Sequence, residues 1–127
     1  TPEILDDLLT LFENIPEYQE SWRLGAGPQI LAGSSENRLG KVLVDMTGGA
    51  DAGKKIYDAA GKASVSTIIS MHMNEEIRST LIENHVNIIL AGHMSSDSIG
   101  LNLFLDQLQN IKIVAGAGLT HYVRVYL

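Results

Sequence analysis

The feature that most constrains the fold is a regular alternation of short β-rich runs with helical runs, which starts at Gln29 and continues toward the C-terminus. The candidate strands, rich in Val and Ile, are residues 29–32, 41–45, 67–71, 87–91, 112–115 and 122–126. The candidate helices between them are residues 51–61, 74–84 and 95–108. Because strands that alternate with helices usually form parallel crossovers, the pattern predicts an α/β fold with a mostly parallel or mixed sheet flanked by helices.

The first 24 residues have a different, purely helical pattern. Thr1 is placed to cap a helix with Pro2 at its first position, and Pro16 starts a second helical stretch that runs through Trp22. Six acidic residues and one basic residue give this segment a charge of −5, whereas the whole chain carries −6. Since the Gly- and Pro-containing stretch 25–28 forms a flexible joint, we expect an acidic helical appendage at 1–24 and an α/β domain at 25–127.

Length, charge and composition exclude several classes of protein. A chain of 127 residues without Cys fits one compact domain, has no disulfides and must use nitrogen and oxygen ligands for any metal. Without a basic stripe, direct nucleic-acid binding is not expected. The apolar runs are only a few residues long, and the N-terminus has no signal-peptide pattern, so we expect no membrane segment and a cytoplasmic protein. The chain begins at Thr1 without Met, which suggests a trimmed or partial chain.

Three of the candidate strands run directly into polar residues. Asp45 ends one strand, His72 follows the next, and His93 follows the third. Loops at the carboxyl ends of neighbouring parallel strands converge on one crevice, which is where ligands usually bind in such sheets. If these strands are neighbours, the three side chains approach a common point.

His93 is followed four residues later by Asp97, and residues with this spacing lie on the same face of a helix. The imidazole nitrogen and the carboxylate oxygen can therefore bind one divalent cation, although a stable site needs about three or four protein ligands. The spacing also fits a purely structural role, in which His93 bonds to the turn and Asp97 interacts with the helix dipole.

The other polar motifs carry weaker signals. The glycine-containing loop 45–51 suits either anion binding by backbone N–H groups or a simple tight turn. His72 lies in a segment that resembles an inverted zinc motif, but Glu76 stands where the closing His would be.

Asn74 is predicted to cap a helix. The helix at 95–108 is apolar around most of its circumference, which predicts that it is buried or lies in an interface.

Residues 91–101, Ala-Gly-His-Met-Ser-Ser-Asp-Ser-Ile-Gly-Leu, strongly resemble a closing motif of the Nif-three-like (interacting-factor-three) family, whose members are often labelled GTP cyclohydrolase type-two homologues. The resemblance extends back through residues 40–42, 48–49, 68–69 and 71–76 and forward to Leu103. It spans roughly residues 25 to 125 and resembles the C-terminal half of such a protein.

The resemblance implies a two-domain α/β metalloprotein with a pair of divalent ions between its halves, assembled into a ring-like homo-oligomer. The family's closing motif supplies a His and, four residues later, a Glu as metal ligands, which correspond to His93 and Asp97 here. The family's adjacent His pair, and a further His and Asp, have no match in this chain. We therefore expect a half-site for zinc, manganese, iron or magnesium ions, completed by a missing N-terminal half and not retained by this chain alone.

Two functional hypotheses follow from these patterns. In the first, the chain is a half-domain of a divalent-metal hydrolase, active only in its full-length context, with His93 and Asp97 as ligands and with Asp45 and His72 lining the cleft or orienting the ligands. In the second, it is a non-catalytic regulatory or oligomerisation domain. The apolar helix that includes Ile99 and the leucine-rich face of residues 4–12 favour the second hypothesis.

Overall fold

The computed structural model describes residues 1–47, 53–114 and 118–124. The helices in this part of the chain are α1 (Leu5–Glu13), α2 (Pro16–Arg23), α3 (Lys54–Lys62), α4 (Glu75–Glu83) and α5 (His93–Leu105). The strands are β1 (Gln29–Ala32), β2 (Lys41–Asp45), β3 (Val65–Ser70) and β4 (Asn87–Leu90). The four strands form one sheet in the order β1-β4-β3-β2, so the predicted α/β class is confirmed.

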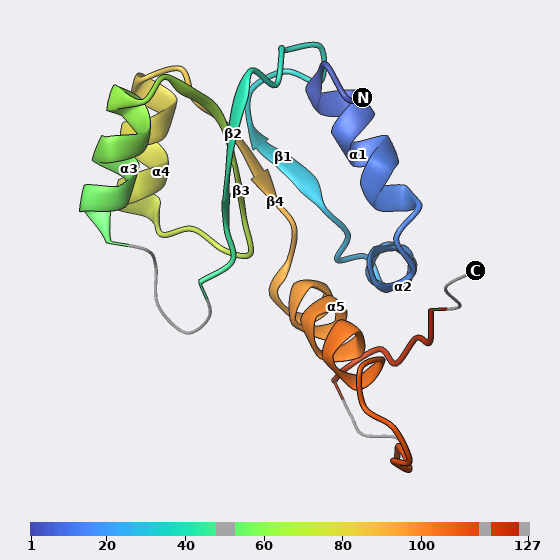
Figure 1. The fold of residues 1–127 in the computed structure, drawn as a ribbon. Coiled ribbons are helices and arrows are strands. Elements are labelled where there is room, and N and C mark those ends of the chain that lie inside the picture. The colour runs from blue at the N-terminus through green and yellow to red at the C-terminus, as the bar shows by residue number, and fades with distance from the viewer. Residues whose placement is uncertain (48–52, 115–117, 125–127) are drawn as a thin grey trace.

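The sheet is mixed. Strands β2, β3 and β4 are parallel, and β1 pairs antiparallel to β4. Helix α3 connects β2 to β3 and α4 connects β3 to β4, which is the crossover pattern that the alternation predicted. Figure 1 shows α3 and α4 on one face of the sheet and α1 on the other. The central strands are covered on both faces, which explains why consecutive isoleucines are buried in each of them, Ile68 and Ile69 in β3 and Ile88 and Ile89 in β4.

Two cores form on the two faces of the sheet, because successive side chains of a strand point in opposite directions. On one face, Ile69 and Ile89 pack with Leu5, Leu8 and Phe12 of α1. The other face carries a second buried cluster, whose members are Tyr57, Ile68, Ile77, Leu81, Val86 and Ile88. The helical segment 1–24 therefore shares a core with the sheet through α1.

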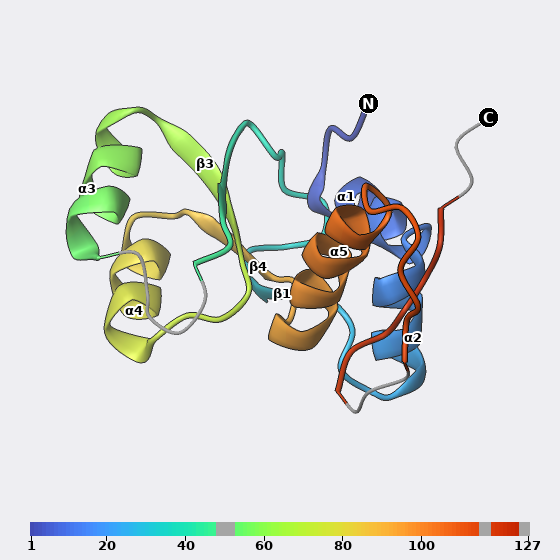
Figure 2. The same ribbon diagram turned by 60° about the horizontal axis from the view of Figure 1, so that its bottom comes forward.

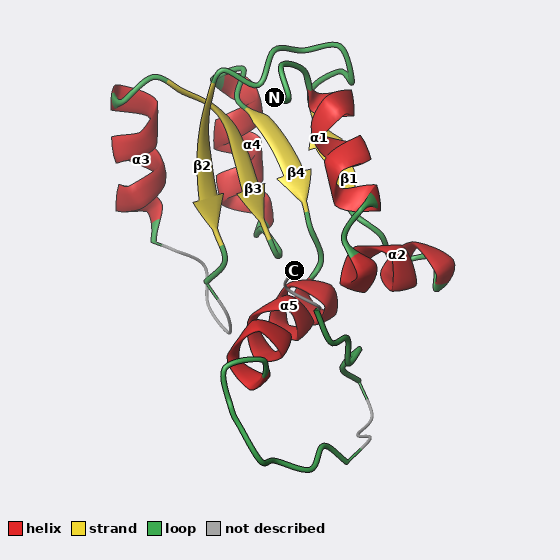
Figure 3. Ribbon diagram, turned by 45° about the vertical axis from the view of Figure 1, so that its right-hand side comes forward, coloured by secondary structure: helices red, strands yellow, loops and turns green. Residues whose placement is uncertain are grey.

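Helix α5 has an unusual distribution of side chains. Its buried residues are the polar Ser95, Ser98 and Asn102, whereas Leu101 and Phe104 are 39% and 60% exposed. Figure 3 shows α5 at the end of the sheet toward which the arrowheads of β2, β3 and β4 point. The C-terminal segment 118–124 lies along α5 and α2, as Figure 2 shows. No helix among the described residues has the length and apolar character needed to cross a bilayer.

Helix α1 begins at Leu5, so the prediction that Thr1 caps a helix starting at Pro2 is wrong. The backbone before Leu5 is held in an extended conformation, because Ile4 forms a β-bridge with Arg38. The carboxylate of Asp7 accepts hydrogen bonds from the N–H groups of Glu3 and Ile4, at 2.9 and 3.1 Å. The capping acceptor therefore comes from within the first turn of the helix.

The strands predicted at 112–115 and 122–126 are absent from the described parts of these segments, 112–114 and 122–124. Ala115 and residues 125 and 126 lie outside the described residues. Alternating β-branched residues make a strand only where a neighbouring strand offers backbone hydrogen bonds, and these segments have none in the described structure. Side-chain contacts to α2 and α5 hold residues 120–124 instead.

Candidate functional site

The carboxyl ends of β2, β3 and β4 bring the predicted site residues to one edge of the sheet. The rings of His72 and His93 meet edge to face, with centroids 5.6 Å apart and planes at 76°. Nε2 of His93 lies 3.7 Å from Oδ2 of Asp97. Asp45 ends β2 beside Ser70 of β3, two residues before His72. The structure therefore places all four predicted residues at one edge of the sheet, where His93 contacts both His72 and Asp97.

His93 and Asp97 are positioned by the sharp entry of the chain into α5. Gly92 precedes the helix with a φ of +90°, a conformation that favours glycine. From there His93 and Asp97 lie one turn apart, and their side chains are 53% and 51% exposed. Both side chains are thus accessible to an incoming ligand.

The separation of these two side chains suits a bound cation. A tetrahedral ion with bonds of about 2.1 Å holds neighbouring ligand atoms about 3.4 Å apart, close to the 3.7 Å between His93 Nε2 and Asp97 Oδ2. An imidazole and a carboxylate also match the nitrogen and oxygen chemistry that zinc, manganese and iron accept. Within the described residues, however, no group of three or more His, Cys, Asp or Glu side chains is placed to hold a metal ion. The pair fits part of a coordination sphere.

Asp45 is buried and its carboxylate is occupied by donors. The hydroxyl of Tyr57 donates to Oδ2 at 2.6 Å, and the N–H of Thr47 donates to Oδ1 at 3.1 Å. Burial raises the pKa of the Asp45 carboxyl, but the hydrogen bonds from Thr47 and Tyr57 and the nearby His72 outweigh this effect and lower the pKa overall. Asp45 is therefore ionised at neutral pH. Residues 48–51 of the predicted anion-binding loop lie outside the described residues.

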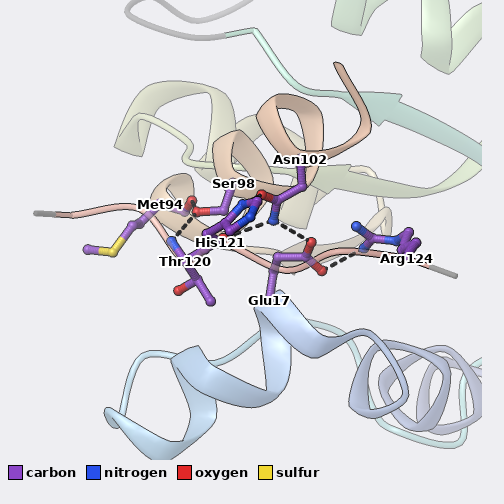
Figure 4. Close-up of polar contacts among 7 residues, drawn as sticks. All are labelled: Glu17, Met94, Ser98, Asn102, Thr120, His121 and Arg124. Atoms are coloured by element: carbon purple, nitrogen blue, oxygen red, sulfur yellow. Dashed lines mark hydrogen bonds and ion pairs between the residues drawn. The ribbon is translucent and has the colours of Figure 1, made fainter. Parts of the chain in front are cut away.

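A buried polar network beside α5, drawn in Figure 4, was missed by the sequence analysis. Glu17 of α2 has a fully buried side chain, and Arg124 donates to its Oε2 at 2.7 Å. Asn102 of α5 donates to Oε1 of Glu17 at 2.8 Å and to the carbonyl oxygen of Thr120 at 2.8 Å. The one available signal was an Asn in the otherwise apolar stretch 99–105.

The same network fixes the C-terminal segment. The hydroxyl of Ser98 donates to the carbonyl oxygen of Met94 at 2.8 Å and accepts from the N–H of Thr120 at 3.1 Å. Nδ1 of His121 lies 3.1 Å from Oδ1 of Asn102. His121 itself is exposed. These contacts place Thr120 beside the first turns of α5, close to His93.

The fold defines an α/β protein with polar side chains at the carboxyl edge of a mixed sheet. Its sequence matches no protein-family model and no curated protein. Among solved structures, the chain is similar to a NIF3 superfamily protein from Sphaerobacter thermophilus, with a TM-score of 0.67 and 24% identity over 80% of this chain and 36% of that one. It is also similar to the Staphylococcus aureus protein SA1388, with a TM-score of 0.52 and 14% identity over 83% of this chain and 27% of that one.

These similarities establish a shared fold. The resemblance carried by residues 91–101 in the sequence is thereby matched by a three-dimensional likeness to a NIF3 superfamily protein. The chain spans about a third of the length of that protein, and about a quarter of the length of the S. aureus protein.

Proposed function

We propose that this chain is the metal-site half-domain of a Nif-three-like divalent-metal hydrolase. In this proposal His93 and Asp97 are two ligands of a dinuclear site, and the remaining ligands belong to an N-terminal half of the same protein. The observation that carries the proposal is the 3.7 Å approach of His93 Nε2 to Asp97 Oδ2, at the edge of a sheet whose fold is shared with a NIF3 superfamily protein.

Each residue of the site has a distinct role in this proposal. A divalent ion, when bound, supplies Lewis acidity for a hydrolytic reaction. His93 would bind the ion through Nε2, and the carboxylate of Asp97 would bind it and partly neutralise its positive charge. The edge-to-face contact with His72 restricts the rotation of the His93 ring, and Asp45, an ionised carboxylate, ends the neighbouring strand β2. Such supporting groups orient the ligands and tune their basicity.

Calorimetric titration with Zn²⁺ and Mn²⁺ tests the proposal. We expect weak binding by the wild-type chain, because two ligands leave most of the coordination sphere to water. His93→Ala and Asp97→Asn should each weaken binding by at least about tenfold. Loss of a residue that merely orients a metal ligand already reduces affinity by about 10- to 100-fold, and loss of a ligand should cost at least as much. His85→Ala is the matched control, since His85 is exposed at the C-terminal end of α4, and it should bind as the wild type does.

Two results would count against this proposal. Equal binding by the wild type, His93→Ala and Asp97→Asn would exclude these residues as ligands. One tight site per chain that disappears in His93→Ala would instead show a complete site within this chain and contradict the half-site proposal.

A second candidate function is self-association, and one observation favours it. Leu101 and Phe104 of α5 are exposed, as is Leu108 just beyond the helix, at 39%, 60% and 42%. Exposed apolar clusters on a folded domain usually mark an interface. On this proposal α5 contributes to a homo-oligomer, a function that is compatible with metal binding at its N-terminal end.

A further inference from the structure

We propose that a pocket at the N-terminal end of α5 binds a small organic phosphate, with the phosphoryl group at the start of the helix and an apolar body along α2. The inference deepens the proposed function, since His93 lines the pocket and the phosphate would lie beside the cation ligands. Anion binding at this pocket, however, can be measured without any metal.

The pocket is large enough for such a ligand. Its volume is about 340 Å³, within the range of roughly 300–1,000 Å³ that is usual for small-molecule sites. Leu24 and Ala26 line one side, Met94 and Ser95 line the side toward α5, and Thr120 of the C-terminal segment contributes a further wall. The Glu17–Arg124 ion pair anchors this segment, so the wall is held in place by a buried contact.

The start of α5 offers hydrogen-bond donors that other described residues leave unused. The N-cap residue, Gly92, has no side chain that could cap the helix, and the first turn contains no acidic residue. The N–H groups of His93, Met94 and Ser95 have no acceptor among the described residues. Helix N-termini with free N–H groups attract anions through these donors and through the helix dipole.

An independent observation comes from the hydroxyl of Ser95. Ser95 is only 6% exposed and lines the pocket, yet its side chain makes no hydrogen bond to a described residue. Its neighbours Ser96 and Ser98 both donate to carbonyl oxygens of the preceding turn, at 2.6 and 2.8 Å. The Ser95 oxygen is not among the fully buried polar atoms of the described residues that lack a partner, so it is accessible at the pocket surface. There it is free to donate to a ligand in the pocket.

The donor set favours a phosphoryl group. Three N–H groups and one hydroxyl match the several oxygens of a tetrahedral oxyanion better than the two oxygens of a carboxylate. Glu20 also lines the pocket, but both of its oxygens are bound by Arg23, so its charge is compensated. Leu24 and Met94, which are 60% and 53% exposed, supply the apolar surface for the body of the ligand.

Titration of the metal-free chain with phenyl phosphate, followed by amide NMR in the presence of EDTA, tests this inference. We expect saturable shifts at the amides of His93, Met94 and Ser95, and weaker binding of inorganic phosphate, which lacks the apolar body. Ser95→Ala should weaken phenyl phosphate binding by about tenfold, the effect of losing one hydrogen bond to a charged group. Leu24→Glu should abolish binding, because it adds a negative charge to the pocket wall.

The matched control is Leu11→Glu, which adds the same charge at an exposed leucine of α1 and should leave binding unchanged. Amide spectra verify that each variant is folded. Absence of shifts at the start of α5, or equal binding by the wild type and the folded Leu24→Glu variant, would overturn the inference. His93→Ala in the metal titration tests the proposed function separately, so the two can fail independently.

Discussion

Glu17 shows how a single contact joins distant parts of this chain. A carboxylate with a fully buried side chain is stable only when donors compensate its charge, and here Arg124 and Asn102 each donate to one oxygen. Arg124 lies 107 positions away in the sequence and keeps 21% of its side chain exposed. Removal of one partner of such a pair leaves an uncompensated buried charge, which costs far more than the loss of a surface ion pair.

Arg124→Met should lower the free energy of unfolding at pH 7 by about 3 kcal/mol, because Glu17 would remain buried without its cation. Arg23→Met is the matched control. Arg23 pairs with Glu20 at the surface, where the two side chains are 68% and 33% exposed, so its loss should cost less than about 1 kcal/mol. Urea denaturation of the three proteins measures both effects. Similar losses of unfolding free energy in the two variants would show that the buried ion pair contributes no more to stability than the surface pair.

Glu17 should also make stability depend on pH. Burial raises the pKa of Glu17, but the hydrogen bonds from Arg124 and Asn102 outweigh this effect and lower the pKa below its ordinary value of 4.5. The unfolded chain therefore binds this proton at a higher pH than the folded chain does. The stabilisation is complete above about pH 4.5 and is lost as the pH falls through the lowered pKa.

Urea denaturation of the wild type and of Glu17→Gln between pH 3 and 7 measures this contribution. The variant should be less stable at pH 7 and should lose less stability toward pH 3, so the difference between the two proteins should shrink as the pH falls. A difference that stays constant with pH would show that Glu17 does not titrate with a lowered pKa.

Asn87 supports the sheet from within β4. It is 6% exposed, accepts a hydrogen bond from Asn37 at 2.8 Å and donates to the carbonyl oxygen of Arg38 at 3.2 Å. Asn87→Ala should lower the free energy of unfolding by about 1–3 kcal/mol, because it leaves these groups unpaired. Asn84→Ala at the exposed end of α4 should change it by about 0.5 kcal/mol or less. Thermal and urea denaturation of the two variants measure this difference. Equal losses of unfolding free energy in Asn87→Ala and Asn84→Ala would contradict the prediction.

At the scale of elements, α4 is the helix whose start was best predicted from sequence. The prediction that Asn74 caps this helix is confirmed, since its Oδ1 accepts from the N–H of Ile77 at 2.9 Å. Glu75 and Glu76 occupy the first turn, where negative charge interacts favourably with the helix dipole. All the residues involved lie within four positions of one another, so their arrangement requires no distant part of the chain.

Asn74→Ala should lower the free energy of unfolding by about 1 kcal/mol, the usual value for loss of an N-cap. Asn74→Asp retains a side-chain acceptor and should restore most of the stability. Denaturation of both variants by urea, followed by circular dichroism, measures the difference. If the Ala and Asp variants are equally stable, the cap has no measurable effect.

At the scale of the whole molecule, α5 presents its polar side inward and much of its apolar side outward. Ser95, Ser98 and Asn102 face α2 and the C-terminal segment, so Leu101 and Phe104 are left exposed. This arrangement is accounted for if another apolar surface covers the exposed face of α5. That surface would belong either to a second copy of the chain or to a further part of the same protein.

Phe104→Glu should therefore reduce self-association, because it places a charge on the exposed apolar face of α5. We expect wild-type chain at micromolar concentration to form oligomers in sedimentation velocity, and the variant to shift toward the monomer. Ile56→Glu, at a residue of α3 that is 49% exposed, is the control and should leave the oligomer unchanged. A monomeric wild-type chain at this concentration would count against the oligomerisation proposal.

The alternation of strands and helices was readable from the sequence because it depends on local periodicity. The predicted bounds of β1 and β2 match the structure, and those of β3 and β4 differ by one or two residues at their ends. The pairing of His93 with Asp97 was predictable for the same reason, since both lie within one turn of a single helix. Their meeting with His72 required one more step, the rule that parallel strands end at a common edge.

Tertiary structure alone decided the contacts between distant segments. The partnership of Glu17 with Arg124, the burial of polar residues on α5 and the absence of strands at 112–114 and 122–124 all depend on which surfaces meet once the chain has folded. Local propensity depends on a few neighbouring residues, and each residue contributes only a fraction of a kcal/mol to it. The free energy of placing one segment against another is a property of the whole chain, and in this protein it determines the surroundings of α5.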